Sequence, residues 1–120
     1  MGWFAKLLGP KFPKIHVREA YQRLQASNPP LIVDVRQPVE TKAGTVPGAI
    51  LIPLTEFGQR YQELPRDRSI LTICRSSHRS PVAARMLAKA GYDVTDVMGG
   101  MMAWEQARLP QARPPQRKGV

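Results

Sequence analysis

Residues 69–85 read Ser69-Ile-Leu-Thr-Ile-Cys74-Arg-Ser-Ser-His-Arg-Ser80-Pro-Val-Ala-Ala-Arg85 and decide the fold of this 120-residue chain. An apolar strand, from Ile70 to Ile73, runs directly into a polar, basic loop. We expect a helix to follow the loop, with Ser80 as its N-cap and Pro81 at its first helical position. Cys74, the only cysteine of the chain, lies where the strand meets the loop.

At that junction the thiol of Cys74 would face the N–H groups of the loop, the positive end of the helix dipole and the cationic side chains of Arg75, His78 and Arg79. Such surroundings lower the pKa of a cysteine from about 8.5 to roughly 3.5–7.5, so that the thiolate predominates at neutral pH. We therefore predict that Cys74 is an accessible, ionised nucleophile. The alternative is a small buried hydrophobe, but six polar or charged residues follow Cys74 in the sequence.

Short apolar runs alternate with helical patterns along the rest of the chain. Apolar, β-branched runs predict strands at 14–17, 31–35, 48–53, 70–73 and 93–98. Amphipathic spacing predicts helices at 18–26, 54–61, 81–90 and 101–107, the second with Thr55 as N-cap and the third closed by Gly91. Gly99 and Gly100 predict a tight turn whose backbone passes close to neighbouring atoms. This alternation is typical of an α/β domain with a mostly parallel sheet of four to five strands.

The net charge is +9, and most of the excess lies at the two ends of the chain. Residues 1–18 and 108–120 each carry four basic side chains and no acidic one, whereas residues 19–107 carry ten basic and nine acidic side chains. We divide the chain into a basic, apolar N-terminal extension (1–13), a folded domain (14–110) and a disordered basic tail (111–120). The basic ends would at most attract RNA or an anionic membrane weakly.

A single cysteine excludes an internal disulfide, which is typical of a reducing compartment, so we expect a cytoplasmic location. No hydrophobic run approaches the length of about 20 residues that crosses a bilayer. An apolar patch near the N-terminus is expected to cover a groove of the domain, with a membrane interface as the alternative; it consists of Trp3, Phe4, Leu7 and Leu8.

Four stretches of the sequence resemble the motifs of the single-domain rhodanese family of sulfurtransferases. They are Val33-Asp-Val-Arg36 with Glu40, Gly44-Thr-Val-Pro-Gly-Ala49, the loop Cys74-Arg-Ser-Ser-His-Arg-Ser80, and Met98-Gly-Gly-Met-Met-Ala-Trp104. Each fragment alone is weak, but their order and spacing together are specific. The resemblance runs from about residue 15 to residue 110. It implies a three-layer α/β domain with helices on both faces of the sheet.

The resemblance also implies a reaction. In that family the active-site cysteine, here Cys74, takes sulfane sulfur from a donor such as thiosulfate, holds it as a persulfide and passes it to cyanide, a thiol or a partner protein. The loop would bind the donor, with Arg75 and Arg79 orienting a dianion; its members are Arg75, Ser76, Ser77, His78, Arg79 and Ser80. The supporting residues would be Asp34, Arg36 and Glu40, the last two as an ion pair. We expect no metal and no cofactor besides the covalent persulfide.

Two positions depart from the family pattern. Ser77 replaces the usual glycine at the fourth loop position, and a residue with a Cβ tolerates a positive φ less well. Thr45 replaces the histidine that commonly follows Gly44, and we expect this to affect only turn packing. Neither change removes the nucleophile.

Other functions on the same fold remain as alternatives. Phosphatases of this fold carry a loop of cysteine, five residues and arginine, whereas Arg79 comes one position early here, so the loop is too small to cradle a phosphoryl group. Arsenate reductase chemistry is disfavoured on the same count. A sulfur carrier or a non-catalytic interaction module is the other alternative, although domains of the latter class typically lose the cysteine or the positive charge of the loop.

Overall fold

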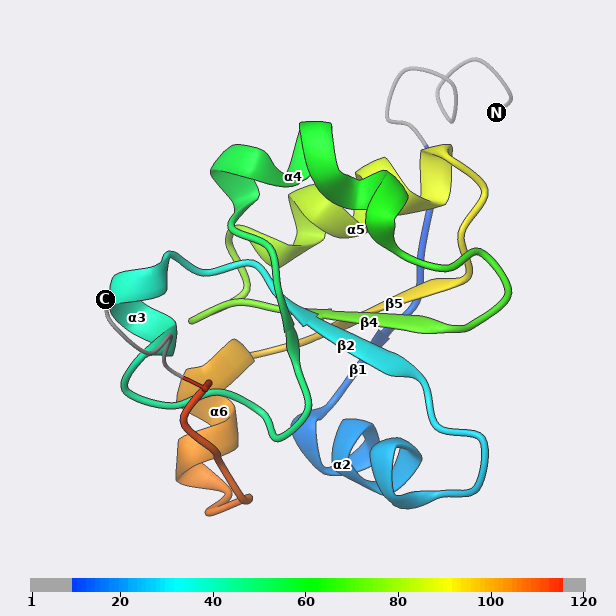
Figure 1. The fold of residues 1–120 in the computed structure, drawn as a ribbon. Coiled ribbons are helices and arrows are strands. Elements are labelled where there is room, and N and C mark those ends of the chain that lie inside the picture. The colour runs from blue at the N-terminus through cyan, green and yellow to red at the C-terminus, as the bar shows by residue number, and fades with distance from the viewer. Residues whose placement is uncertain (1–9, 116–120) are drawn as a thin grey trace.

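A sheet of five parallel strands lies at the centre of the computed structural model, which describes residues 10–115 (Figure 1). The order across the sheet is β1-β5-β4-β2-β3. The strands are β1 (Lys14–Ile15), β2 (Leu31–Asp34), β3 (Ile50–Leu51), β4 (Ile70–Ile73) and β5 (Val94–Val97). The central strands are apolar and β-branched because both faces of the sheet are covered. The sequence-based expectation of an α/β domain with four to five mostly parallel strands is confirmed.

Strand β4 occupies the middle of the sheet and ends at Cys74. Its register pairs Ile73 with Asp34 of β2, and Thr72 with Asp96 of β5. Because all the strands run in the same direction, the residues that follow β2 and β4 meet at one edge of the sheet. This edge therefore brings together the two motifs that begin at Asp34 and Cys74.

Helices cover both faces of the sheet, as the resemblance implied (Figure 1). Helices α4 (Leu54–Arg60) and α5 (Ser80–Lys89) cover one face, and α2 (Val17–Gln25) and α6 (Gly100–Gln106) cover the other. Each face has its own hydrophobic core. Phe57 and Leu87 belong to the first core, and Leu71 and Trp104 belong to the second. The two cores hold the sheet rigidly between the helix layers, which fixes the position of the loop that follows β4.

The starts of several helices differ from the sequence-based expectations. A short helix, α3 (Pro38–Thr41), and a 3₁₀ turn, η1 (Tyr61–Glu63), were not anticipated, because segments this short carry little periodic signal. Thr55 is not an N-cap, because α4 already begins at Leu54.

Helix α5 begins one residue earlier than predicted, so that Ser80 is its first helical residue and Arg79 its N-cap. The expectation that Gly91 would close this helix is confirmed by its φ of 91°.

The segment after Pro110 is partly ordered, contrary to the expectation of a disordered tail from residue 111. Ala112 and Thr45 exchange two backbone hydrogen bonds, of 2.9 and 2.8 Å. The indole Nε1 of Trp104 donates to the carbonyl of Pro110 at 2.8 Å, which leads the chain back across the domain. The domain limits at residues 14 and 110 stay a prediction. The apolar patch of Trp3, Phe4, Leu7 and Leu8 lies outside the described residues, among which no helix is long and apolar enough to cross a membrane.

The Gly99–Gly100 turn packs against the backbone of the cysteine loop, as expected. Gly99 and Gly100 both have positive φ, of 79° and 57°. The N–H groups of Met101 and Met102 donate to the carbonyls of Cys74 and Arg75 at 2.8 and 3.0 Å. A Cβ on Gly100 would lie only 2.5 Å from the carbonyl carbon of Arg75. The start of α6 therefore holds the start of the loop in place.

We expect Gly100→Ala to lower the free energy of unfolding by about 2 kcal/mol or more, because it combines an unfavourable φ with a backbone clash. The matched control is Gly58→Ala in α4, where a Cβ would meet only a methionine methyl at 3.5 Å. That control should be neutral or stabilising by up to about 1 kcal/mol. Urea unfolding measures both variants, and equal stabilities would contradict the close packing.

Candidate functional site

Cys74 is buried at the carboxyl end of β4, with only 1% of its surface exposed. The prediction that this residue is accessible is therefore wrong. Its sulfur faces N–H groups of Ser76, Arg79 and Ser80, which come from both ends of the loop. Because donors from both ends converge on one atom, the loop wraps around the sulfur and shields it from solvent. The thiol lies between this polar wrapping and the apolar core beneath α5.

The pKa of Cys74 is lowered, in the predicted direction. Burial of the sulfur raises the pKa, but the hydroxyl of Ser80 and the N–H groups of Ser80, Arg79 and Ser76 together outweigh that effect. Hydrogen bonds to the ionised form therefore stabilise the thiolate more than desolvation destabilises it. The cationic side chains that the sequence suggested are not the main cause.

The exposed side chains of Arg75 and His78 do not belong to these contacts. Arg75 and His78 are exposed, and Arg75 makes no side-chain hydrogen bond to a described residue. The ring Nδ1 of His78 lies 3.1 Å from the hydroxyl of Ser76. Both exposed side chains can therefore meet an anion that approaches the loop from solvent.

Ser77 occupies the position where a glycine was expected, and its φ is indeed positive, at 77°. Its hydroxyl accepts a hydrogen bond of 2.5 Å from the N–H of Gly99. The Cβ of Ser77 makes this backbone conformation unfavourable, but the hydroxyl of the same side chain connects the loop to the turn before α6.

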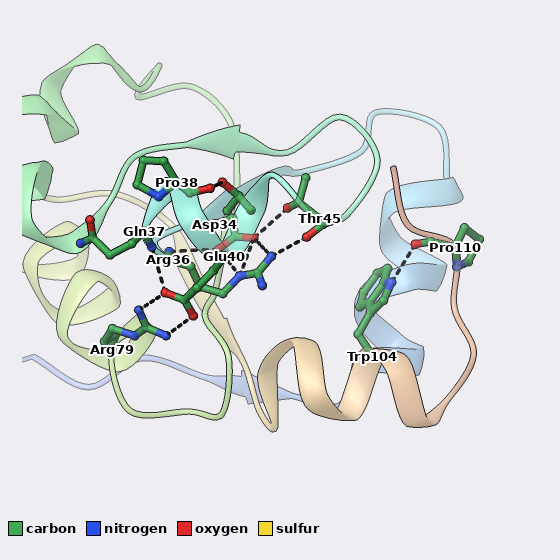
Figure 2. A network of polar contacts seen from close by, with 11 residues as sticks. Asp34, Arg36, Gln37, Pro38, Glu40, Thr45, Arg79, Trp104 and Pro110 are labelled. Atoms are coloured by element: carbon green, nitrogen blue, oxygen red, sulfur yellow. Dashed lines mark hydrogen bonds and ion pairs between the residues drawn. The ribbon is translucent and has the colours of Figure 1, made fainter. Parts of the chain in front are cut away.

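Arg79 pairs with Glu40 of α3 rather than standing free to bind a donor (Figure 2). Two parallel hydrogen bonds, of 2.7 and 2.8 Å, join the guanidinium to the two carboxylate oxygens. The N–H of Gln37 donates a third bond to Glu40 at 3.1 Å. The hydrogen bond from Arg79 is the largest cause that lowers the pKa of Glu40, from 4.5 to about 2. The expected ion pair between Arg36 and Glu40 is therefore wrong.

Arg36 instead forms a buried ion pair with Asp34 (Figure 2). Its Nη2 lies 2.8 Å from the Asp34 carboxylate and donates to the carbonyl of Gly44 at 2.7 Å. The hydroxyl of Thr45 donates to the same carboxylate at 2.7 Å. Thr45 thus does more than pack a turn: it joins β2 to the segment that pairs with Ala112. These residues support the edge of the sheet and do not reach the sulfur.

One residue of the site was missed by the sequence analysis. Asp96 of β5 is 1% exposed, and burial raises the pKa of its carboxyl group. Asp96 falls within the strand predicted at 93–98, and no separate role was predicted for it. A carboxylate between Thr95 and Val97 in a strand with two buried faces was the signal that could have identified it.

Comparison with known proteins relates this arrangement to one family. Residues 16–107 match the family model described as a rhodanese-like domain. The chain is 37% identical over 94 residues to a sulfurtransferase of Allochromatium vinosum, covering 78% of this chain and 88% of that protein. It is 36% identical over 93 residues to a putative sulfur carrier protein of Bacillus subtilis, covering 77% of this chain and half of that protein.

A solved structure gives the same relationship. The crystal structure of a rhodanese-related protein from Thermoplasma volcanium matches with a TM-score of 0.80 at 28% sequence identity. The match covers 86% of this chain and all of that chain. The similarity therefore extends over the sheet, both helix layers and the loop after β4.

Substitution of Ser77 separates its backbone cost from its hydrogen bond. We expect Ser77→Ala to be less stable than Ser77→Gly by about 1 kcal/mol, since both lose the bond to Gly99 but only alanine keeps a Cβ at positive φ. Urea unfolding of the two variants measures the difference. An alanine variant as stable as the glycine variant would show that the loop relaxes to another backbone conformation.

The depressed pKa of Glu40 predicts how its contribution to stability depends on pH. Its stabilising effect is complete above about pH 5 and is lost as the pH falls from 4.5 towards 2, because the unfolded state then binds the proton first. Glu40→Gln should therefore be clearly less stable than the wild type at pH 7, and the gap should narrow at about pH 3. The control is Glu105→Gln, an exposed residue without an ion pair to a described residue. A gap that stays constant with pH would contradict the prediction.

Proposed function

Because this chain belongs to the rhodanese-like family through residues 16–107, we propose that it is a sulfurtransferase in which Cys74 carries sulfane sulfur as a persulfide. The proposed donor is a small anion such as thiosulfate. The proposed acceptor is cyanide, a thiol or a partner protein. The observation that carries the proposal is the convergence of three N–H groups and a hydroxyl on the Cys74 sulfur.

The reaction is balanced without an added oxidant or reductant. The Cys74 thiolate attacks the outer sulfur of thiosulfate, and the sulfur–sulfur bond of the donor breaks. Sulfite leaves with the electron pair, and Cys74 holds the transferred sulfur as a persulfide anion. An acceptor nucleophile then attacks the outer sulfur and restores the thiolate. The hydrogen-bond donors that stabilise the Cys74 thiolate before the first step also stabilise it as the leaving group of the second step. The same contacts therefore serve both halves of the reaction.

The burial of Cys74 restricts how reactants approach. A small donor would have to enter the loop, where the exposed side chains of Arg75 and His78 attract an anion. In the loaded state the outer sulfur lies one bond further from the backbone than the thiol does. We propose that this outer sulfur is the atom that an acceptor reaches. Arg79 contributes its N–H group, while its guanidinium remains paired with Glu40.

A sulfur-carrier role is the second candidate, and a specific observation favours it. One of the similar proteins is named a putative sulfur carrier protein, although this chain covers only half of it. The chain has no second cysteine that could discharge the persulfide internally. An enzyme and a carrier then differ in how often sulfur passes through Cys74. An enzyme is reloaded and discharged repeatedly, whereas a carrier delivers one equivalent.

Intact-mass measurement after incubation with thiosulfate tests the proposal. We expect the wild type to gain the mass of one sulfur atom and then to form thiocyanate when cyanide is added. Cys74→Ser should lose both the mass gain and thiocyanate formation down to the uncatalysed background, because serine cannot form a persulfide.

Since Cys74 is the only cysteine, wild-type protein blocked beforehand with iodoacetamide serves as a matched control and should also fail to load. Thiocyanate formation by Cys74→Ser or by the blocked protein would refute the mechanism. Repeated turnover with excess cyanide supports an enzyme, whereas one equivalent of transfer favours a carrier.

A further inference from the structure

Three polar side chains lie on the same face of the sheet, beneath the start of α5. Thr72 and Cys74 are two residues apart, so their side chains point to the same face of the sheet. Asp96 pairs in register with Thr72 on the neighbouring strand β5, which places its side chain on that face as well. Asp96 is thus a diagonal neighbour of Cys74 in the sheet, and α5 packs over both.

Two atoms in this cluster are buried without a conventional hydrogen bond. Thr72 donates to Oδ1 of Asp96 at 2.9 Å, but Oδ2 of Asp96 has no partner among the described residues. The hydroxyl of Ser80 is the second such atom, and its residue is fully buried. Unsatisfied buried polar groups are rare because each costs free energy, so a functional pairing is the physical explanation to test first.

The Ser80 hydroxyl lies near enough to both acids to affect their ionisation, although it satisfies the geometry of a hydrogen bond with neither. It lowers the pKa of Cys74, and it also lowers the pKa of Asp96. A single hydroxyl has one proton to donate, so it can stabilise either the thiolate or the carboxylate at a given moment, but not both. Ser80 is the first residue of α5, and its side chain is directed at these two groups instead of capping the helix.

We propose that Asp96 is a positioning residue for Cys74: in its neutral form it donates a hydrogen bond to Ser80, whose hydroxyl is then directed at the sulfur. This inference rests on the proposed role of Cys74 as a sulfur-carrying thiolate. When Asp96 is ionised, its carboxylate accepts the hydrogen bond of the Ser80 hydroxyl instead. The carboxylate then also adds a second negative charge on the strand next to that of Cys74. The pair Asp96–Cys74 therefore favours holding one negative charge over holding two.

The groups around Asp96 are consistent with this arrangement. Burial raises the pKa of its carboxyl group, while Ser80, Thr72 and the charge of Lys14 on the edge strand β1 lower it. Burial is the largest of these effects. The carboxyl group therefore stays protonated to a higher pH than an exposed aspartate would, and two interacting acids titrate in two macroscopic steps.

The rate at which iodoacetamide alkylates Cys74, measured against pH, tests the proposal without any sulfur donor. We expect two inflections in the wild type. Asp96→Asn should show one, because a neutral amide donates to Ser80 at every pH and imitates protonated aspartate. Ser80→Ala should raise the pKa of Cys74, which lowers the alkylation rate about tenfold at pH values below that pKa.

Matched controls come from the far end of the same two strands, where the hydroxyl of Ser69 donates to the exposed Asp93 at 2.6 Å. Asp93→Asn and Ser69→Ala should keep the two wild-type inflections. Thermal unfolding of all four variants identifies any that fail to fold. If Ser80→Ala does not fold, the comparison of the isosteric Asp96→Asn with the wild type decides whether the proposal stands.

The proposal is overturned if Asp96→Asn reproduces the wild-type pH profile, or if Ser80→Ala leaves the pKa of Cys74 unchanged. Failure of the proposed function is a separate result, since it would appear as no sulfur gained from thiosulfate by the wild type. Changed alkylation profiles with no sulfur loading would retain the positioning role and reject the sulfurtransferase. Sulfur loading with an unchanged alkylation profile would retain the sulfurtransferase and reject the positioning role of Asp96.

Discussion

The convergence of loop N–H groups on one buried sulfur is the constraint on which the site depends. Burial alone would suppress ionisation of Cys74, and only the donors of Ser76, Arg79 and Ser80 reverse its effect. Those donors are aimed correctly only if both ends of the loop are held. The first turn of α5 holds one end, and the Gly99–Gly100 turn, which bonds to the carbonyls of Cys74 and Arg75, holds the other.

The two ion pairs near the loop fix the backbone around it. The Arg79–Glu40 pair fastens the end of the loop to α3, and it stays ionised because its two hydrogen bonds favour the charged carboxylate. The Asp34–Arg36 pair is buried and well satisfied, so loss of either partner would leave an uncompensated charge. The basic loop of the sequence thus has, in the folded chain, one anchored guanidinium, that of Arg79, and two exposed side chains, those of Arg75 and His78.

Burial of the reactive thiol changes how the chemistry is understood. Enclosure by amides shields the sulfur of Cys74 from bulky reactants, and in the proposed reaction a transferred sulfur atom would extend its reach by one bond. Ser80 and Asp96 are as buried as Cys74, so water does not screen the interactions among these three residues. Under the proposed positioning role, the protonation state of the Asp96 carboxyl group influences the thiol of Cys74 on the neighbouring strand.

The sequence by itself determined the α/β alternation, the central strand 70–73, the glycine turn and the identity of Cys74 as the candidate nucleophile, because these depend on local periodicity and on residue types. Only the tertiary structure decided that Cys74 is buried, that Arg79 rather than Arg36 pairs with Glu40, and that Asp96 lies on the strand next to that of Cys74. The physical reason is distance along the chain. Glu40 and Arg79 are 39 residues apart, and such contacts are set by strand register and helix packing, which no local pattern encodes.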